Sequence, residues 1–287
     1  MTPTSAEPCI RILHHWACSG GTILSRCVAA LPEVLLLSEV HPLAYLRLHD
    51  PSSAYAPTDL IQQLCLPHNG RDPALCLASW NGAIDALQQQ ALLQGKQLVL
   101  RSHSHVDFFC GALPANQPFV SRSLTPRHRL VELLSVRHPL DSWISIQAQQ
   151  WDRHMRFGSF GGFCERAMAM LDACQGMPVL VYDQFSADPA SGLQQLCSAL
   201  QLPHHPDSLD HLAGVTLSGD SGRSADRISP RPRRPITPAL RTELEASLAG
   251  DASHSPYQQL CERLGYDPNP DAAHPYTLQQ HGAERFS

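Results

Sequence analysis

The sequence predicts a three-layer α/β fold, in which helices cover both faces of a central parallel sheet of about five strands. Two observations predict this fold class. Short apolar, β-rich segments recur along the chain, and segments with the apolar spacing of helices separate them. Strands that alternate with helices form parallel sheets through right-handed crossovers. With 287 residues, the chain is long enough to bury a full core, and we expect a single domain over 1–287.

The first predicted strand, 9–16, is apolar enough to be buried in the middle of the sheet. A helix over 23–31 follows it and stops at Pro32, and a second short strand is predicted over 34–37. Residues 50–72 read as a loop. The later strands are predicted at 97–100, 129–136 and 178–182, and the later helices at 73–94, 140–150, 163–174 and 189–200. From about residue 203 the chain is expected to be irregular and arginine-rich, with two short helices near 238–248 and 257–264.

Composition excludes several classes of protein. The formal net charge is −5, so no overall basic field is present to attract nucleic acid. Apolar runs are too short to span a bilayer, and no basic segment followed by an apolar one marks a signal peptide; we therefore expect a cytoplasmic protein. The 10 cysteines lack paired short spacings and are expected to be reduced and mostly buried.

Small residues lie at the junction between the first strand and the first helix. The run 19–22 reads Ser-Gly-Gly-Thr, in which glycines let backbone N–H groups approach a ligand and the hydroxyls add donors. A phosphate-binding loop is one interpretation, and an ordinary tight strand–helix turn is the other. The run is not a Walker A motif, because no Gly-Lys-Ser/Thr follows it, which argues against a nucleotide kinase.

Three further segments carry a resemblance to a known family. Residues 137–145 read Arg-His-Pro-Leu-Asp-Ser-Trp-Ile-Ser, with Ser145 eight positions after Arg137. Residues 98–103 end in Arg-Ser-His, and residues 217–223 form a late Gly/Arg loop. Together with the small-residue loop, and in the same order, these segments resemble the sulfotransferases that use 3′-phosphoadenylyl sulfate (PAPS), as a divergent bacterial-type member with a P-loop-like fold.

The resemblance implies that PAPS is the co-substrate and that the acceptor is a hydroxyl or an amine. It assigns the 5′-phosphosulfate to the first loop and the 3′-phosphate to Arg137 and Ser145, helped by Arg223. One position departs from the family pattern, because Cys18 stands where most members have a basic residue. Arg101 or Arg26 is the expected substitute for that charge. The residues expected to bind the co-substrate are therefore Cys18, Ser19, Gly20, Gly21, Thr22, Arg137, Ser145 and Arg223.

Two residues are candidates for the base that accepts the proton of the acceptor. His103 matches the histidine of the cytosolic sulfotransferases, and an imidazole suits base catalysis near neutral pH. Glu39 is similar in position to the glutamate of other members, and Glu39-Val40-His41 resembles the Glu-Val-His of the heparan-sulfate type. Glu39 is slightly preferred, His41 and Arg101 are kept in the catalytic set, and the choice between Glu39 and His103 stays open.

Other interpretations remain beside this one. His103 and His105 alternate as metal ligands do, but no carboxylate or cysteine lies at a helpful spacing, so no metal is expected. A catalytically silent nucleotide-binding or interaction protein on the same fold is the main alternative. The acceptor, whether a small molecule, a lipid or a carbohydrate, and the oligomeric state are left open by the sequence. Aromatic residues that could line an acceptor pocket are Phe108, Phe109, Trp151 and Phe157.

Overall fold

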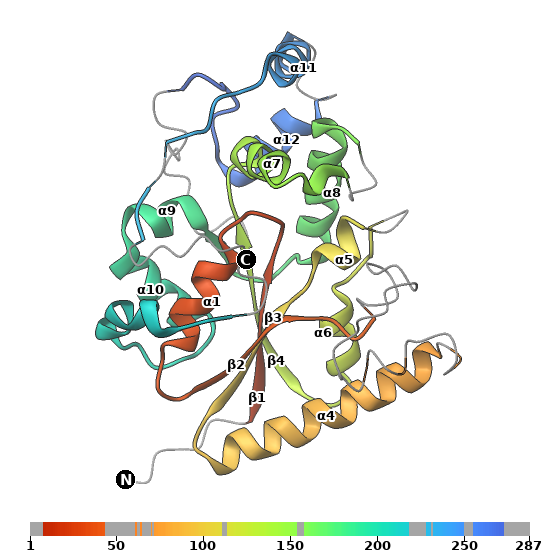
Figure 1. Ribbon diagram of the computed structural model, residues 1–287, viewed down its shortest axis with the longest axis vertical. Helices are drawn as coiled ribbons and strands as arrows, with labels where there is room; N and C mark the ends of the chain where they lie inside the picture. The colour runs from red at the N-terminus through yellow and green to blue at the C-terminus, as the bar shows by residue number, and fades with distance from the viewer. Residues whose placement is uncertain are drawn as a thin grey trace.

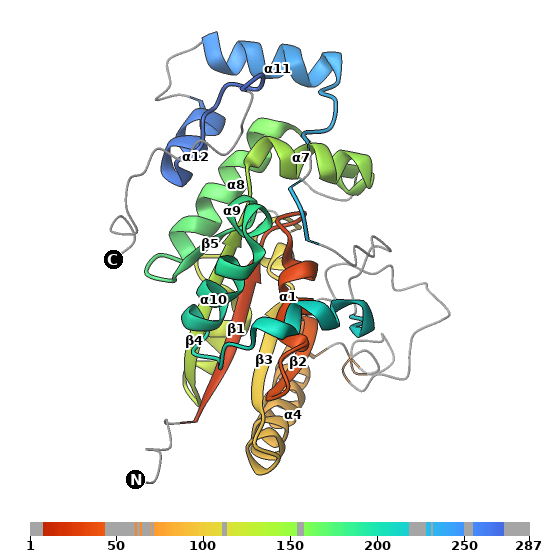
Figure 2. The same ribbon diagram turned by 90° about the vertical axis from the view of Figure 1, so that its left-hand side faces the viewer.

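A five-stranded parallel sheet forms the centre of the protein (Figures 1 and 2). The computed structural model describes residues 8–43, 61, 64, 70, 72–110, 114–153, 158–217, 228–230, 232–249 and 255–272. The strands are β1 (Cys9–His15), β2 (Val34–Val40), β3 (Gln97–Ser102), β4 (Arg129–Val136) and β5 (Val179–Val181). Their order in the sheet is β2-β3-β1-β4-β5, and every pair is parallel. The predicted fold class is confirmed.

The central position of β1 follows from its side chains, since all seven of its residues are buried. Ile10 and Ile12 face one side of the sheet and Leu13 faces the other, as the alternation of a strand requires. Three polar residues of β1, Arg11, His14 and His15, are buried as well. The guanidinium of Arg11 donates to the backbone carbonyls of Leu200, at 2.7 Å, and Gln201, at 3.0 Å. A buried charge is tolerable only when it is hydrogen-bonded in this way.

Helices cover both faces of the sheet (Figure 1). On one face, α1 (Gly21–Ala29) and α10 (Pro189–Ala199) pack against Leu13, with the 3-10 segment η3 (Pro206–Gly214) beside them. On the other face, α4 (Pro73–Leu93) and α6 (Phe119–Leu124) pack against Ile10 and Ile12. Because all five strands are parallel, their carboxyl ends lie at one edge of the sheet.

A third apolar cluster lies beyond that edge, above the strand ends in Figures 1 and 2. It joins Trp16 and Phe163 to residues of the two C-terminal helices, including Leu244 and Tyr257. The helices that build it are α5 (His105–Phe108), α7 (Pro139–Ala148), α8 (Phe160–Ala173), α11 (Pro238–Ala249) and α12 (Pro256–Leu264). In the part of the chain that the structure describes, no helix is long and apolar enough to cross a membrane.

Several elements differ from the sequence prediction. The strand predicted over 178–182 is shorter, because Tyr182 begins another helix, α9 (Tyr182–Ala187). The short helices α5, α6 and η3 and the 3-10 turn η2 (Trp151–Arg153) were not predicted, since they contain too few turns to show a helical periodicity. β2 runs on to Val40, past the predicted end at residue 37. The nine described cysteines are all free, and seven of them are buried.

His138 is the N-cap residue of α7 and is fully buried. Its Nδ1 accepts a hydrogen bond from the Leu140 N–H at 3.2 Å, and its Nε2 lies 3.3 Å from the Asp267 carbonyl. Burial, helped by the charge of Arg233, lowers the pKa of His138 from 6.5 to about 4. Between these two values the unfolded chain binds more protons than the folded protein, so acid lowers the free energy of unfolding.

Replacing His138 with asparagine should remove that acid sensitivity, because asparagine can accept the Leu140 hydrogen bond but does not titrate. Between about pH 7 and about pH 4, we expect the wild type to lose about 3 kcal/mol more free energy of unfolding than His138→Asn. Urea unfolding at a series of pH values measures the difference, because the other titrating groups are common to both proteins. Parallel pH curves would contradict the assignment.

Candidate functional site

The loop between β1 and α1 is built on unusual backbone angles and close contacts. Cys18 has φ 61° and Gly20 has φ 86°, both in the left-handed region. A Cβ atom at Gly20 would lie 2.1 Å from the Tyr182 ring, and one at Gly21 would lie 2.6 Å from the His15 ring. Glycine is therefore required at both positions, because the Tyr182 and His15 rings occupy the space that a side chain would need. No side chain caps the start of α1, so its first N–H groups point into the loop region.

The hydroxyl of Ser19 is used within the loop. It donates to the Trp16 carbonyl at 2.9 Å, while the Ser135 hydroxyl donates to the Ser19 carbonyl at 3.1 Å. Ser19 is fully buried, and its side chain therefore stabilises the loop and does not face outward as the sequence interpretation expected. The other predicted hydroxyl donor in the loop, Thr22, accepts a hydrogen bond from Arg101.

Arg101 connects the loop to the neighbouring strands. Its guanidinium donates to Thr22 Oγ1, to Ser38 Oγ and to His15 Nε2, each at 3.1 Å. It also forms an ion pair with Oε1 of Glu39. Arg101 is only 3% exposed, so these partners supply the hydrogen bonds that a buried guanidinium needs. Of the two arginines proposed to replace the missing basic residue, Arg101 is the one beside the loop, whereas Arg26 donates to the Leu212 carbonyl.

Glu39 lies at an irregular point of β2. The register with β3 shifts between Leu37 and Val40, and Glu39 has φ 58°, a left-handed angle that is costly for a residue with a side chain. This bulge directs the carboxylate toward His15 and His103, each of whose Nε2 atoms lies 3.6 Å from a Glu39 oxygen. Burial raises the pKa of Glu39, but the adjacent His15 imidazole and the charge of Arg101 outweigh it, so the pKa is held well below its ordinary value.

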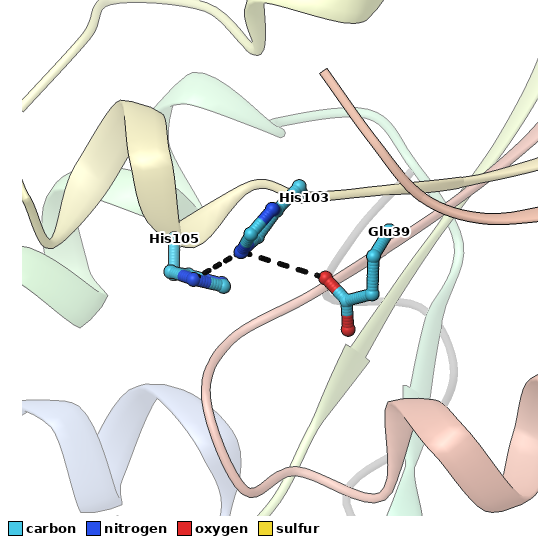
Figure 3. Close-up of side chains that lie close together, drawn as sticks. All are labelled: Glu39, His103 and His105. Atoms are coloured by element: carbon cyan, nitrogen blue, oxygen red, sulfur yellow. Dashed lines mark hydrogen bonds and ion pairs between the residues drawn. The ribbon is translucent and has the colours of Figure 1, made fainter. Parts of the chain in front are cut away.

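Two histidines complete this corner of the site (Figure 3). The Nε2 atoms of His103 and His105 contact each other, and Figure 3 shows both rings beside the Glu39 carboxylate. Burial lowers the pKa of His103 to about 4, against the opposing charge of Glu39, and lowers the pKa of His105 well below its ordinary value. Both imidazoles are therefore neutral near pH 7.

A second cluster surrounds Arg137, which follows the last residue of β4. Its Nη1 lies 3.3 Å from the Cys18 carbonyl oxygen and 3.5 Å from Ser145 Oγ, so the structure brings Arg137, Ser145 and the loop together. The guanidinium lies over the Tyr182 ring at 5.6 Å and pairs with Asp183 at 3.5 Å. The loop at 18–22 and the start of the 137–145 segment therefore lie side by side at the carboxyl edge of the sheet.

Asp183 is held in turn by its own partners. It accepts hydrogen bonds from the His138 N–H at 2.9 Å and from the Tyr266 hydroxyl at 2.6 Å. Burial raises the pKa of Asp183, although Arg137 and the two hydrogen bonds oppose the rise. Tyr182 and Asp183 were not assigned to the site from the sequence, where they read as the end of a strand. Their aromatic and acidic character directly after that strand is the signal that could have suggested them.

Other predicted residues lie apart from these clusters. His41 is buried, with Nε2 3.0 Å from Asp107 and Nδ1 accepting from the Leu43 N–H, so both ring nitrogens are engaged away from the loop. Asp141, in the run 137–145, pairs with Arg233 at 3.0 and 3.2 Å. Phe108 and Phe109 are fully buried in the core beyond the strand ends. Arg223, Phe157 and most of the predicted loop 50–72 lie outside the described residues.

The fold and these clusters define the class of the protein. It is a three-layer α/β protein in which polar and charged residues from β1, β2, β3 and β4 gather at the carboxyl edge of a parallel sheet, where such sheets bind ligands. No family model and no curated protein matches the sequence.

Two solved structures specify the fold further. The sulfotransferase domain from the Synechococcus PCC 7002 olefin synthase aligns with a TM-score of 0.51 and 17% identity, over 93% of this chain and 98% of that one. The sulfotransferase domain from the curacin biosynthetic pathway aligns with a TM-score of 0.50 and 16% identity, over 91% of this chain and 99% of that one. The chain has the sulfotransferase fold.

Proposed function

We propose that the protein transfers a sulfuryl group from PAPS to a hydroxyl or amine of a small-molecule, lipid or carbohydrate acceptor. One observation carries the proposal: Arg137 lies within 3.3 Å of the loop carbonyl of Cys18 and 3.5 Å of Ser145. An arginine and a serine beside a glycine-rich loop at a helix start form a set of donors suited to a nucleotide with two separate phosphate groups.

Arg101 would supply the charge that Cys18 lacks. In sulfuryl transfer the leaving phosphate gains negative charge, and a fixed cation near the loop stabilises that charge in the transition state. Arg101 already donates to Thr22 of the loop and is held by Ser38 and His15, so it needs little reorganisation to act. Arg101 also pairs with Glu39, and Glu39 lies beside His103, so the cation is adjacent to both candidates for the base.

The geometry favours His103 as the base and Glu39 as its positioning partner. One oxygen of Glu39, Oε1, is engaged by Arg101, and the other, Oε2, lies 3.6 Å from His103 Nε2. A proton taken by His103 from the acceptor would thus form an imidazolium next to a carboxylate, which stabilises it. This assignment reverses the slight preference for Glu39 that the sequence suggested.

Matched substitutions test this assignment. We expect His103→Asn to lower kcat by about 10²–10⁴-fold with little change in KM, because it removes the base. Glu39→Gln should lower kcat less, by roughly 10-fold to 100-fold, because the base remains but loses its partner. If Glu39→Gln abolished turnover while His103→Asn kept most of it, the glutamate would be the base.

A catalytically silent nucleotide-binding protein is the second candidate, and Cys18 at the position of a basic residue favours it. Incubation with radiolabelled PAPS separates the two functions. Release of adenosine 3′,5′-bisphosphate (PAP), with or without an acceptor, supports an enzyme, whereas tight binding with no release supports the silent protein. Magnesium-dependent binding of ATP in preference to PAP would contradict the sulfotransferase proposal and favour a kinase.

A further inference from the structure

We propose that Glu39, His103 and His105 form a binding site for a divalent transition-metal ion of the Zn²⁺ type, and that an ion bound there blocks the transfer reaction. The three side chains come from β2, from the residue after β3 and from the start of α5. Figure 3 shows their polar atoms turned toward one another. Metal binding stands on this geometry alone, while the block of the reaction rests on the proposed function.

The donor atoms are close enough to share one ion. One ligand atom from each residue lies within 4.8 Å of the others. Oε2 of Glu39 is 3.6 Å from Nε2 of His103, and this nitrogen contacts Nε2 of His105. Ligands about 2.1 Å from a tetrahedral zinc ion lie ~3.4 Å apart, so the carboxylate and His103 are already spaced for binding. The two imidazole nitrogens contact each other and would have to move apart to admit the ion.

An unsatisfied atom points into this cluster. Glu39 Oε2 is buried and accepts no hydrogen bond from any residue that the structure describes. A buried carboxylate oxygen without a partner is costly, and a bound cation is one of the few ways to satisfy it. The other oxygen, Oε1, is held by Arg101. Metal-ligating carboxylates usually have this kind of outer partner, which orients the free oxygen toward the ion.

The set of donors selects the kind of metal. Two imidazole nitrogens and one carboxylate oxygen suit zinc and neighbouring transition ions, whereas magnesium and calcium prefer oxygen donors alone. Three protein ligands leave a coordination position open for water or another ligand. The left-handed backbone of Glu39 at φ 58° is also consistent with a built site, because it turns the carboxylate from the strand toward the histidines.

Occupancy would compete with the reaction, since the ion would use the lone pairs of His103 Nε2 and Glu39 Oε2. These are the atoms that the proposed function uses to accept and stabilise the proton. His105 is the third ligand, and the proposed transfer assigns it no proton. Its Nε2 contacts that of His103, so the effect of zinc on His105→Ala is measured against the metal-free rate of the same variant.

Cobalt titration of the metal-free full chain gives a direct readout of binding. We expect one Co²⁺ per chain with visible d–d absorption, displaced by one equivalent of Zn²⁺, and at least ~10-fold weaker binding in His105→Ala. His205→Ala is the matched control, because it removes another histidine paired with a glutamate, Glu33 at 3.0 Å, and should bind cobalt as the wild type does. Equal affinity in His105→Ala and wild type, or bands typical of cobalt–thiolate bonds, would overturn the site.

An activity assay tests the second half of the inference. Zinc should inhibit transfer by the wild type and by His205→Ala at concentrations that have much less effect on His105→Ala. Inhibition that is equal in all three proteins, or absent from a wild type that binds cobalt, would overturn the block. If no protein transfers sulfuryl groups under any condition, the proposed function fails, and the cobalt spectra still decide the metal site.

Discussion

Replacing Arg137 with alanine should weaken the binding of PAP by about 2–4 kcal/mol, which corresponds to roughly 30-fold to 1,000-fold in Kd. The substitution would remove charge-assisted hydrogen bonds to a phosphate. It also removes one of the partners of Asp183, which is buried and pairs with Arg137 at 3.5 Å. Calorimetric titration with PAP at fixed salt measures the change.

Arg129→Ala is the control for this experiment. Arg129 is the first residue of β4, whereas Arg137 follows its last, so the two arginines lie at opposite ends of one strand. The control removes the same charge from the chain but leaves the carboxyl edge of the sheet intact, and its affinity for PAP should match the wild type. If both variants bound PAP as tightly as the wild type, Arg137 would have no place in the nucleotide site.

Arg101→Lys should lower kcat for sulfuryl transfer by about 10²-fold or more while changing the affinity for PAP much less. Lysine keeps the positive charge next to Glu39, so the buried carboxylate is not left unpaired. It cannot reproduce the three hydrogen bonds that Arg101 donates to His15, Ser38 and Thr22. The cation would therefore lose its fixed position near the loop, and the transition state would lose stabilisation.

Two further variants make this result specific. Arg26→Lys changes another buried arginine, which donates to the Leu212 carbonyl, and should leave kcat nearly unchanged. Adding Cys18→Lys to Arg101→Lys should restore part of the rate, because it places a charge in the loop at the position where most members of the family that the sequence resembles carry a basic residue. A full rate in Arg101→Lys alone would show that the leaving phosphate is stabilised by another residue.

Local patterns in the sequence determined most of the elements. The apolar periodicity of 129–136 coincides with β4, and the predicted strand at 9–16 ends one residue past β1. The sequence also predicted that Arg137 and Ser145 lie close together. Both belong to one strand–helix unit, in which eight residues span about two helical turns. The glycines at 20 and 21 are local as well, since they mark a turn between a strand and a helix.

The tertiary structure alone decided which side chains meet. Glu39, Arg101 and His15 come together because β3 lies between β2 and β1, an order that the periodicity of each strand does not specify. The bulge at Glu39 sets the direction of its carboxylate, and no alternating pattern predicts a left-handed residue there. Glu39 could not be recognised from the sequence as the third ligand of the proposed metal site, because 64 positions separate it from His103. Elements follow from interactions between near neighbours in sequence, whereas this site depends on the packing of strands that are distant in the chain.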